Sequence, residues 1–226
     1  MNKTPTADNR FDVNNRSQAV EVMIDVLGAV AEDSELSQRS LAERLGLALG
    51  LTNAVLKRCV KKGLLKIRQA PARRYAYYLT PQGLTEKGRL TAEYLGFSLR
   101  FFRQARQEYG DALAYCGRRG WTRVVLVGAT DLTEIASLAT AGSGVTVVAV
   151  LDPERNERTF CGLPVIRTLD ELGPSDRAQA VVLGNIIDPQ GAYDSLIKVL
   201  PQERVIAPKV LRVLTVGDPD YEEAFS

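Results

Sequence analysis

The spacing of apolar residues changes near Gly120 and divides the chain into two parts. Before Gly120, apolar residues recur mostly every three or four positions, which is the period of amphipathic helices. After Gly120, short continuous apolar runs alternate with helix-like segments. Buried parallel strands covered by helices on both faces produce this alternation. The pattern therefore predicts a mainly helical N-terminal part and an α/β C-terminal part.

Two short neighbouring helices are predicted in the first part. One covers SQRSLAERLG, with Leu41, Ala42 and Leu45 at helical spacing, and ends at Gly46. The other covers LTNAVLKRCVKKG and ends at Gly63. Two helices joined by the tight turn LALG indicate a helix-turn-helix, in which the second helix reads DNA. The apolar face of this second helix consists of Val55, Leu56, Cys59 and Val60.

A β-hairpin is predicted directly after the second helix. Leu65 and Ile67, and then Tyr75, Tyr77 and Leu79, fit two strands joined by the turn QAPAR. A basic hairpin in this position can follow the DNA backbone or reach the minor groove. These features predict a winged helix-turn-helix DNA-binding domain over residues 16–88. Its basic hairpin residues include Lys66, and the expected DNA contacts are Gly50, Thr52, Asn53, Lys57, Arg58, Lys61, Arg68, Arg73 and Arg74.

The net charge of +2 conceals a strong asymmetry along the chain. Residues 37–106 contain 15 basic and 3 acidic side chains, residues 1–36 contain 3 and 7, and residues 107–226 contain 11 and 17. A basic block between acidic neighbours indicates contact with a polyanion, and a solvated charged surface is the alternative. Together with the helix pair and the hairpin, the charge favours double-stranded DNA over a winged helix that binds protein.

Missing residue types exclude several chemistries. The chain has no histidine, and its 3 cysteines, Cys59, Cys116 and Cys161, lie far apart. Ser-His-Asp and Cys-His catalysis are therefore excluded, and we predict no metal site and no catalytic residue. An odd number of scattered cysteines suits a reducing cytoplasm. No apolar run approaches the roughly 20 residues of a membrane span, and no signal peptide is recognisable, so we expect a cytoplasmic protein without membrane contact.

Residues 89–119 are predicted to form a helical connector that has a narrow apolar stripe. The stripe either packs on its own domain or forms a dimer seam. We favour a homodimer because DNA half-sites are normally read by two-fold pairs. Residues 1–15 and 215–226 are expected to be tails, the first of them flexible. The stripe consists of Leu90, Tyr94, Phe97, Phe101, Ala105, Tyr109 and Ala112.

Residues 120–214 are predicted to form a small Rossmann-like domain, with strands in RVVLVGA, VTVVAVLD, QAVVLGN and RVIAP. In the turn GATDL, Thr130 stands where a dinucleotide-binding turn has its second glycine, which disfavours NAD in its usual pose. A helix N-terminus there could still hold a phosphate. Asp152, at the end of the second strand, either accepts a ribose hydroxyl or only forms a turn. The expected ligand residues are Gly128, Ala129, Thr130, Asp131, Asp152 and Asn185.

Two parts of the chain resemble known families. SLAERLGLALGLTNAVLKRCVKKGLLKI and the later LTPQGLTEKGRLT resemble the MarR-like winged-helix regulators associated with bacterial exopolysaccharide gene clusters. This resemblance covers roughly residues 20–105 and implies surface-polysaccharide genes as targets. Ala48 departs from it, because such sequences tend to have a serine there that can cap the recognition helix.

VGATDLTEIASLA, with the later VVAVLD and CGLPVI, is similar to the nucleotide-sugar-binding N-terminal domain of bacterial sugar-nucleotide acetyltransferases. This similarity spans roughly residues 122–200 and implies a nucleotide or nucleotide-sugar ligand. CoA-binding and redox-sensing repressor domains share much of the same pattern. The matching residues are Gly128, Ala129, Asp152, Gly162, Pro164 and Val165.

The sequence as a whole predicts an α+β N-terminal winged helix-turn-helix, a helical connector and a small α/β Rossmann-like parallel-sheet domain. We expect a DNA-binding transcriptional regulator whose operator affinity is modulated by a nucleotide or nucleotide-sugar effector. A C-terminal domain that only oligomerises is the alternative. A sugar-nucleotide-modifying enzyme is disfavoured, because no tyrosine has a lysine four residues later, the domain is too short for a sugar subsite and hexapeptide repeats are absent. Apart from the expected nucleotide or nucleotide-sugar effector, no cofactor is predicted.

Overall fold

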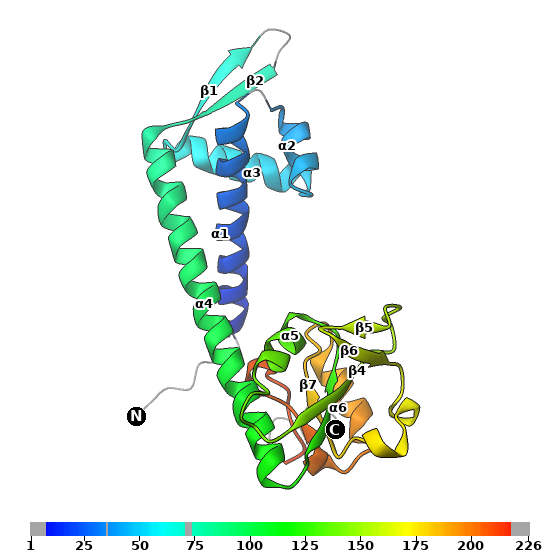
Figure 1. Cartoon of the computed structure of the whole chain (residues 1–226). Helices are drawn as coiled ribbons and strands as arrows, with labels where there is room; N and C mark the ends of the chain where they lie inside the picture. Colours follow the sequence, from blue (N-terminus) through cyan, green and yellow to red (C-terminus); the bar gives the residue numbers. More distant parts are fainter. Residues whose placement is uncertain (1–7, 35, 71–73, 218–226) are drawn as a thin grey trace, which may run out of the picture. The chain divides into compact units, whose positions relative to one another are not determined.

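A computed structural model describes residues 8–34, 36–70 and 74–217 of the chain (Figure 1). The chain divides into two compact units, Met1–Leu99 and Arg100–Ser226. Helix α4 (Pro81–Arg118) contributes its first part to the N-terminal unit and its last part to the C-terminal unit. This helix begins earlier than the connector expected over 89–119, and the boundary between the units lies inside it.

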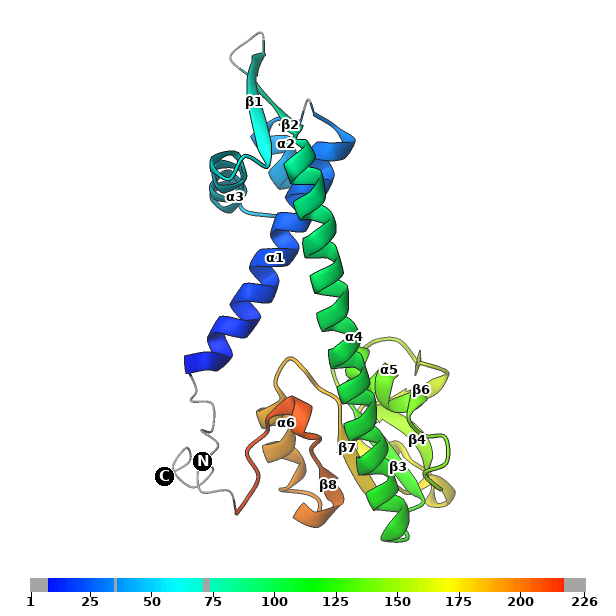
Figure 2. The same ribbon diagram turned by 90° about the vertical axis from the view of Figure 1, so that its left-hand side faces the viewer.

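The N-terminal unit contains a helix pair followed by a hairpin, in the predicted order. Figures 1 and 2 both show the hairpin projecting beyond the helices of this unit. Its strands are antiparallel, with Leu65 opposite Leu79 and Ile67 opposite Tyr77. The elements are α1 (Asp8–Glu32), α2 (Gln38–Arg44), α3 (Leu49–Lys61), β1 (Leu65–Ala70) and β2 (Arg74–Leu79).

Helix α1 begins at Asp8, inside the segment 1–15 that we expected to be a flexible tail. Its first turns, DNRFDVNN, are rich in asparagine and aspartate, which have low helix propensity, so the sequence gives no periodic helical signal there. Residues 1–7 lie outside the described residues, as does most of the expected tail 215–226.

One apolar cluster holds the N-terminal unit together. It joins Leu27 of α1, Leu41 of α2, Leu56 of α3, Tyr77 of β2 and Leu90 of α4, all of which are buried. Every element of the unit therefore contributes at least one buried side chain to the same core. This shared core is what fixes the position of α3 relative to the hairpin.

The segment LTPQG contains the end of β2 and the start of α4. Thr80 caps α4, because its Oγ1 accepts the N–H of Gly83 at 2.9 Å and donates to the carbonyl of Gly63 at 2.8 Å. Pro81 follows in the first helical position, where its missing N–H costs nothing. A Cβ at Gly83 would lie 2.1 Å from the carbonyl oxygen of Leu64, so the helix can approach this strand closely only with glycine there.

The C-terminal unit contains a mixed sheet with the strand order β5-β6-β4-β3-β7-β8. The chain moves from β3 outward to β4 and β6 on one side, and then returns to β7 and β8 on the other side. All neighbours pair in parallel except β5, which is antiparallel to β6. The strands are β3 (Arg123–Val127), β4 (Thr146–Leu151), β5 (Thr159–Phe160), β6 (Leu163–Ile166), β7 (Ala180–Leu183) and β8 (Val205–Ile206).

Four of these strands, β3, β4, β7 and β8, lie in the predicted runs, whereas β5 and β6 were not predicted. These two short strands form a hairpin whose two-residue turn has positive φ at both Cys161 (51°) and Gly162 (76°). Helix α5 (Asp131–Leu138) follows β3, and helix α6 (Pro189–Leu196) follows β7. The sheet is therefore mixed, and not the wholly parallel one we expected.

The last part of α4 packs on this sheet. Ala105, Tyr109 and Cys116 are fully buried there, and the Tyr109 hydroxyl donates to the carbonyl of Leu183 at 2.7 Å. Burial raises the pKa of Tyr109 above its ordinary range. The second half of the apolar stripe predicted for dimerisation thus belongs to the core of the C-terminal unit.

Candidate nucleic-acid interface and ligand cavity

Helix α3 has the two faces that a recognition helix needs. Val55, Leu56 and Cys59 are buried as predicted, and burial raises the pKa of the Cys59 thiol to about 11. Gly63 lies just after the end of the helix, and its φ of +71° allows the N–H of Leu64 to reach the carbonyl of Cys59 at 2.9 Å. The buried face and the glycine stop together fix which side of α3 faces solvent.

The exposed side of α3 carries the predicted basic residues. Lys57, Arg58 and Lys61 are exposed, and so is Gly50 in the first turn. None of the ion pairs within the described residues involves these three cations. Their charges are therefore available to a polyanion such as DNA.

Two predicted contacts in α3 behave differently. Thr52 is fully buried and its hydroxyl donates to the carbonyl of Ala48 at 3.2 Å, so the expectation that Thr52 contacts DNA is wrong. Asn53 is half-buried, and its Oδ1 is buried without a hydrogen-bond partner among the described residues. Asn53 can read a base only if its amide turns outward.

The first turn of α3 lacks a side-chain cap and exposes apolar residues instead. Ala48 is the N-cap and makes no capping hydrogen bond, as expected from its side chain. Leu49 and Leu51 are 43% and 47% exposed. Apolar side chains in this position can contact thymine methyl groups in the major groove. Neither leucine was predicted from the sequence as a DNA contact, because the pattern of apolar residues near a helix start first indicates a core position.

The hairpin places part of its predicted basic surface on one face. Lys66 and Arg68 are exposed and lie opposite Tyr78 and Ala76 in the register. Residues two apart on a strand share a face, so both cations point the same way. Arg73 lies outside the described residues, and Arg74 is the first residue of β2 but its side chain is not described.

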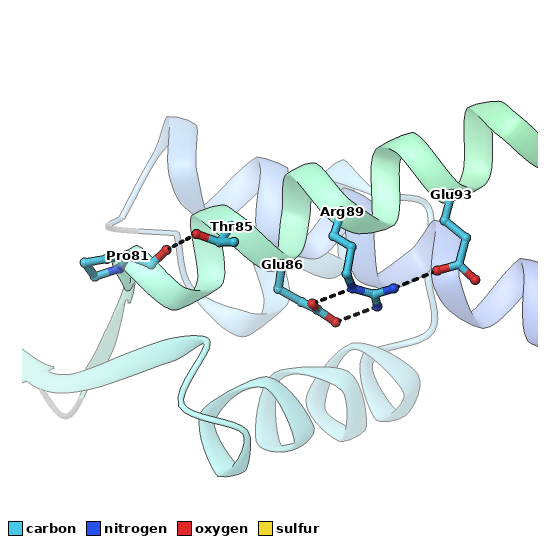
Figure 3. Close-up of polar contacts among 5 residues, drawn as sticks. All are labelled: Pro81, Thr85, Glu86, Arg89 and Glu93. Carbon is cyan, nitrogen blue, oxygen red and sulfur yellow. Dashed lines mark hydrogen bonds and ion pairs between the residues drawn. The ribbon is translucent and has the colours of Figure 1, made fainter.

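Not all of the basic block is free to bind an anion. Arg89 donates to Glu86 through two nitrogens at 2.8 Å and to Glu93 at 2.9 Å (Figure 3). The hydrogen bond from Arg89 lowers the pKa of Glu86. Arg44 is likewise paired with Glu32. The number of basic residues in this block therefore overstates the number of cations that are free to contact DNA.

A cavity of about 580 Å³ opens at the carboxyl ends of β3, β4 and β7 in the C-terminal unit. Such ends, where the chain reverses its direction across a sheet, are the usual ligand position in α/β domains. The cavity brings together five of the six predicted ligand residues. They are Gly128, Ala129, Thr130, Asp152 and Asn185, whereas the exposed Asp131 is not in its lining.

The polar groups of this turn are largely engaged by the protein itself. Asp152 accepts the N–H of Ala129 at 2.9 Å and the N–H of Glu154 at 3.1 Å, so its carboxylate does form the strand-end turn. The Thr130 hydroxyl donates to the carbonyl of Gly184 at 2.5 Å and does not cap α5. Thr130 therefore serves mainly to join two turns.

Glycine is required where the β3 turn meets the β7 turn. Gly128 has a φ of +88°, and a Cβ there would lie 2.8 Å from the Cα of Asn185. The side chain of Asn185 accepts the N–H groups of Ile187 and Asp188 at 2.9 and 3.1 Å. The first glycine of the predicted motif is thus explained by packing between two loops.

Among the cavity residues that were not predicted from the sequence are Arg155 and Asp188. Asp188 caps α6 by accepting the N–H of Gly191 at 2.9 Å, and Pro189 follows it. An Asp-Pro pair before a helix is a recognisable start signal. Arg155 lies in an irregular loop after Asp152, where periodicity gives no information.

Residues 8–34, 36–70 and 74–217 contain neither a metal-binding cluster nor a membrane-spanning helix. No group of three or more acidic or cysteine side chains there is arranged to hold a metal ion. None of the helices in these ranges has both the length and the apolar content needed to span a membrane.

Residues 21–66 match the family described as winged helix-turn-helix DNA-binding. This match covers α2, α3 and the first residues of β1. The N-terminal unit is therefore a winged helix-turn-helix domain of the DNA-binding type. No curated protein sequence matches the chain.

Several solved structures are similar to part of the chain. The PcaV transcriptional regulator from Streptomyces coelicolor is 25% identical over 38% of this chain and 74% of its own, with a TM-score of 0.30. MepR, a transcription regulator of the Staphylococcus aureus multidrug efflux pump MepA, is 17% identical over 45% and 84%, with a TM-score of 0.33. A MarR transcriptional regulator from Methanosarcina mazei is 16% identical over 41% and 74%, with a TM-score of 0.32.

Proposed function

We propose that the chain is a DNA-binding transcriptional regulator in which the winged helix binds an operator and a Rossmann-like C-terminal domain binds a small effector. The observation that carries the DNA-binding part is the exposed basic face of α3, whose Lys57, Arg58 and Lys61 form no ion pair with any described residue. The hairpin adds Lys66 and Arg68 on one face. Surface-polysaccharide genes are the proposed targets, by the sequence resemblance described above.

The proposed regulator is a homodimer. The apolar stripe of α4 supports this only in its middle, where Phe97 and Phe101 are 41% and 42% exposed. Leu95 and Leu99 are exposed beside them. Leu90 and Tyr109, toward the two ends, are buried in the cores of the two units. We therefore propose that the dimer contact lies in the middle of α4. The variant Phe97→Glu should shift the full-length protein from dimer toward monomer, as measured by light scattering.

The DNA assignment is tested by a salt titration of binding to an operator selected from random double-stranded DNA. Each phosphate contact contributes about one unit to the slope of log affinity against log salt. The double variant Lys57→Ala, Lys61→Ala should therefore reduce the slope by about two. A control that also removes two exposed positive charges, Arg177→Ala with Lys198→Ala in the C-terminal unit, should leave the slope unchanged. Equal effects of both variants would refute the assignment to α3.

A further inference from the structure

The lining of the C-terminal cavity is dominated by negative charge. Asp152, Glu154 and Asp188 are part of it, and Arg155 is the one basic residue among the lining residues. Arg155 is already engaged: it donates to the carbonyl of Ala129 at 2.8 Å and its guanidinium lies 4.7 Å from the ring centre of Phe160. Its Nε lies 3.1 Å from Glu157 but makes no hydrogen bond within the described residues, so a carboxylate outside the lining offsets only part of the Arg155 charge.

The two helix starts at this edge of the sheet are also blocked for anions. A phosphate at a helix N-terminus needs free N–H groups and the positive end of the helix dipole. Helix α5 carries Asp131 and Glu134 in its first turn. Helix α6 is capped by the carboxylate of Asp188. At α6 a carboxylate of the protein already occupies the helix N-terminus, and at α5 the negative charge of two carboxylates in the first turn opposes a bound phosphate.

Apolar groups cover much of the rest of the cavity. Ile187 belongs to the lining but is 89% exposed, so its side chain is solvated when no ligand is bound. The volume of about 580 Å³ falls in the range of small-molecule sites. The apolar lining residues are Val127, Ala129, Leu151, Pro153, Ile187, Ala192 and Leu196.

The polar groups that remain are suited to hydroxyl groups, which can both donate and accept hydrogen bonds. Each oxygen of Asp152 accepts one backbone N–H, which leaves further lone pairs on both oxygens. Neighbouring hydroxyls of a sugar can donate to such a carboxylate. The Oδ1 of Asn185 is held by two backbone N–H groups, so its amide N–H₂ is the group left for a ligand. Ser195 adds a hydroxyl to the lining.

We propose that the cavity binds a nucleoside, with the ribose hydroxyls on Asp152 and the base on the apolar lining, and that 5′-phosphates weaken this binding. The proposal rests on the proposed function, because it names the effector of the proposed sensor domain. It narrows the expected nucleotide or nucleotide-sugar to the one part for which the cavity has complementary chemistry.

Calorimetric titration of the full-length protein tests the proposal. The probes are adenosine, guanosine, cytidine and uridine, each compared with its 5′-diphosphate at low and at high salt. At least one nucleoside should bind, and its diphosphate should bind about threefold or more weakly at low salt, with a smaller difference at high salt. Equal or tighter binding of the diphosphate overturns the proposal, as does the absence of binding by all four nucleosides at millimolar concentration.

A charge variant makes the test independent of folding defects. The side chain of Glu154 is exposed and only its backbone N–H holds the turn. Glu154→Gln should therefore tighten diphosphate binding by about twofold to fivefold more than it changes nucleoside binding. Glu203→Gln, an exposed position outside the cavity, is the matched control and should change neither. An unchanged diphosphate affinity in Glu154→Gln counts against the electrostatic argument.

A second variant tests the ribose contact. Asp152→Asn should abolish nucleoside binding. Circular dichroism establishes whether this variant still folds. If it does not, the result for Glu154→Gln decides whether the proposal holds. DNA binding is measured separately on the same preparation. Loss of DNA binding with intact nucleoside binding refutes the proposed regulator and not the ligand site, and the reverse result refutes only the ligand site.

Discussion

The backbone of Gly83 lies against the carbonyl oxygen of Leu64, at a distance that leaves no room for a Cβ on residue 83. Gly83→Ala should therefore destabilise the protein by about 1–3 kcal/mol, because α4 or the start of β1 must move. Urea denaturation of the full-length protein measures this change.

Gly88 provides the matched control on the same helix. A Cβ there would meet nothing within 4 Å, so Gly88→Ala should stabilise the protein by about 0.5–1 kcal/mol through helix propensity alone. If both variants changed the free energy of unfolding in the same direction, the close approach at Gly83 would not be the cause.

The hydrogen bond between Tyr109 and Leu183 should be visible in stability as well. Tyr109→Phe removes a bond to a carbonyl in the core and should cost about 1–2 kcal/mol. Tyr78→Phe, which alters a 39% exposed ring on the hairpin, should change the free energy of unfolding by less than about 0.5 kcal/mol. Comparable values for the two variants would argue against a specific role for the Tyr109 hydroxyl.

The basic face of the hairpin should contact DNA phosphates without reading sequence. Lys66→Ala with Arg68→Ala should lower the salt slope of DNA binding by about two and leave the preferred operator sequence unchanged. Arg44→Ala with Arg89→Ala removes the same charge from residues already paired with glutamates, so it should have a smaller effect. A change in sequence preference in the hairpin variant would instead indicate base contacts.

The three cysteines should differ in reactivity. Cys161 is exposed, whereas Cys59 and Cys116 are buried. A thiol-specific reagent should therefore modify one thiol per native chain and all three after unfolding. Burial and the nearby Glu134 raise the pKa of Cys161, so this reaction should be slower than that of free cysteine. Rapid modification in the Cys161→Ser variant would contradict the buried positions of the other two.

The buried thiols also predict a loss of stability at high pH. Burial raises the pKa of both Cys59 and Cys116 from 9.0 to about 11. Below pH 9 both states keep these protons; between about 9 and 11 only the unfolded thiols ionise, so stability falls as pH rises. Each thiol contributes at most about 1.4 kcal/mol per pH unit. Urea denaturation of the Cys59→Ala, Cys116→Ala variant should show a shallower decline across this window.

The sequence predicted those elements that have a periodic apolar pattern or that end at a recognisable stop residue such as glycine. The buried face of α3 followed from the spacing of Val55, Leu56 and Cys59, and its end followed from Gly63. Thr52 could not be assigned in this way, because a threonine can satisfy its hydroxyl on the preceding turn of the helix and be buried.

The unpredicted strands β5 and β6 have a different cause. They have two and four residues, and Pro164 interrupts the apolar run in β6, which argues against a strand in sequence terms. The hairpin turn at Cys161 and Gly162 also lacks the usual Asn-Gly pair. Short pairings of this kind depend on contacts with the neighbouring β4 and leave little local signal.

The predicted ligand residues converged because the carboxyl ends of parallel strands meet at one edge of a sheet. That rule brings Gly128, Asp152 and Asn185 together without any knowledge of the loops. It does not give the charge of the cavity, because Arg155, Glu154 and Asp188 come from loop segments. The charge preferred in a ligand can therefore be inferred only from the three-dimensional arrangement of these loops.

The exposed thiol at the tip of the β5–β6 hairpin offers a built-in attachment point for a reporter. Cys161 interacts electrostatically with Arg155, which belongs to the cavity lining. A single environment-sensitive dye attached to Cys161 would therefore lie close to the proposed effector site, and no cysteine would have to be introduced. Its emission would follow ligand occupancy in real time, in the same cuvette in which operator DNA is added.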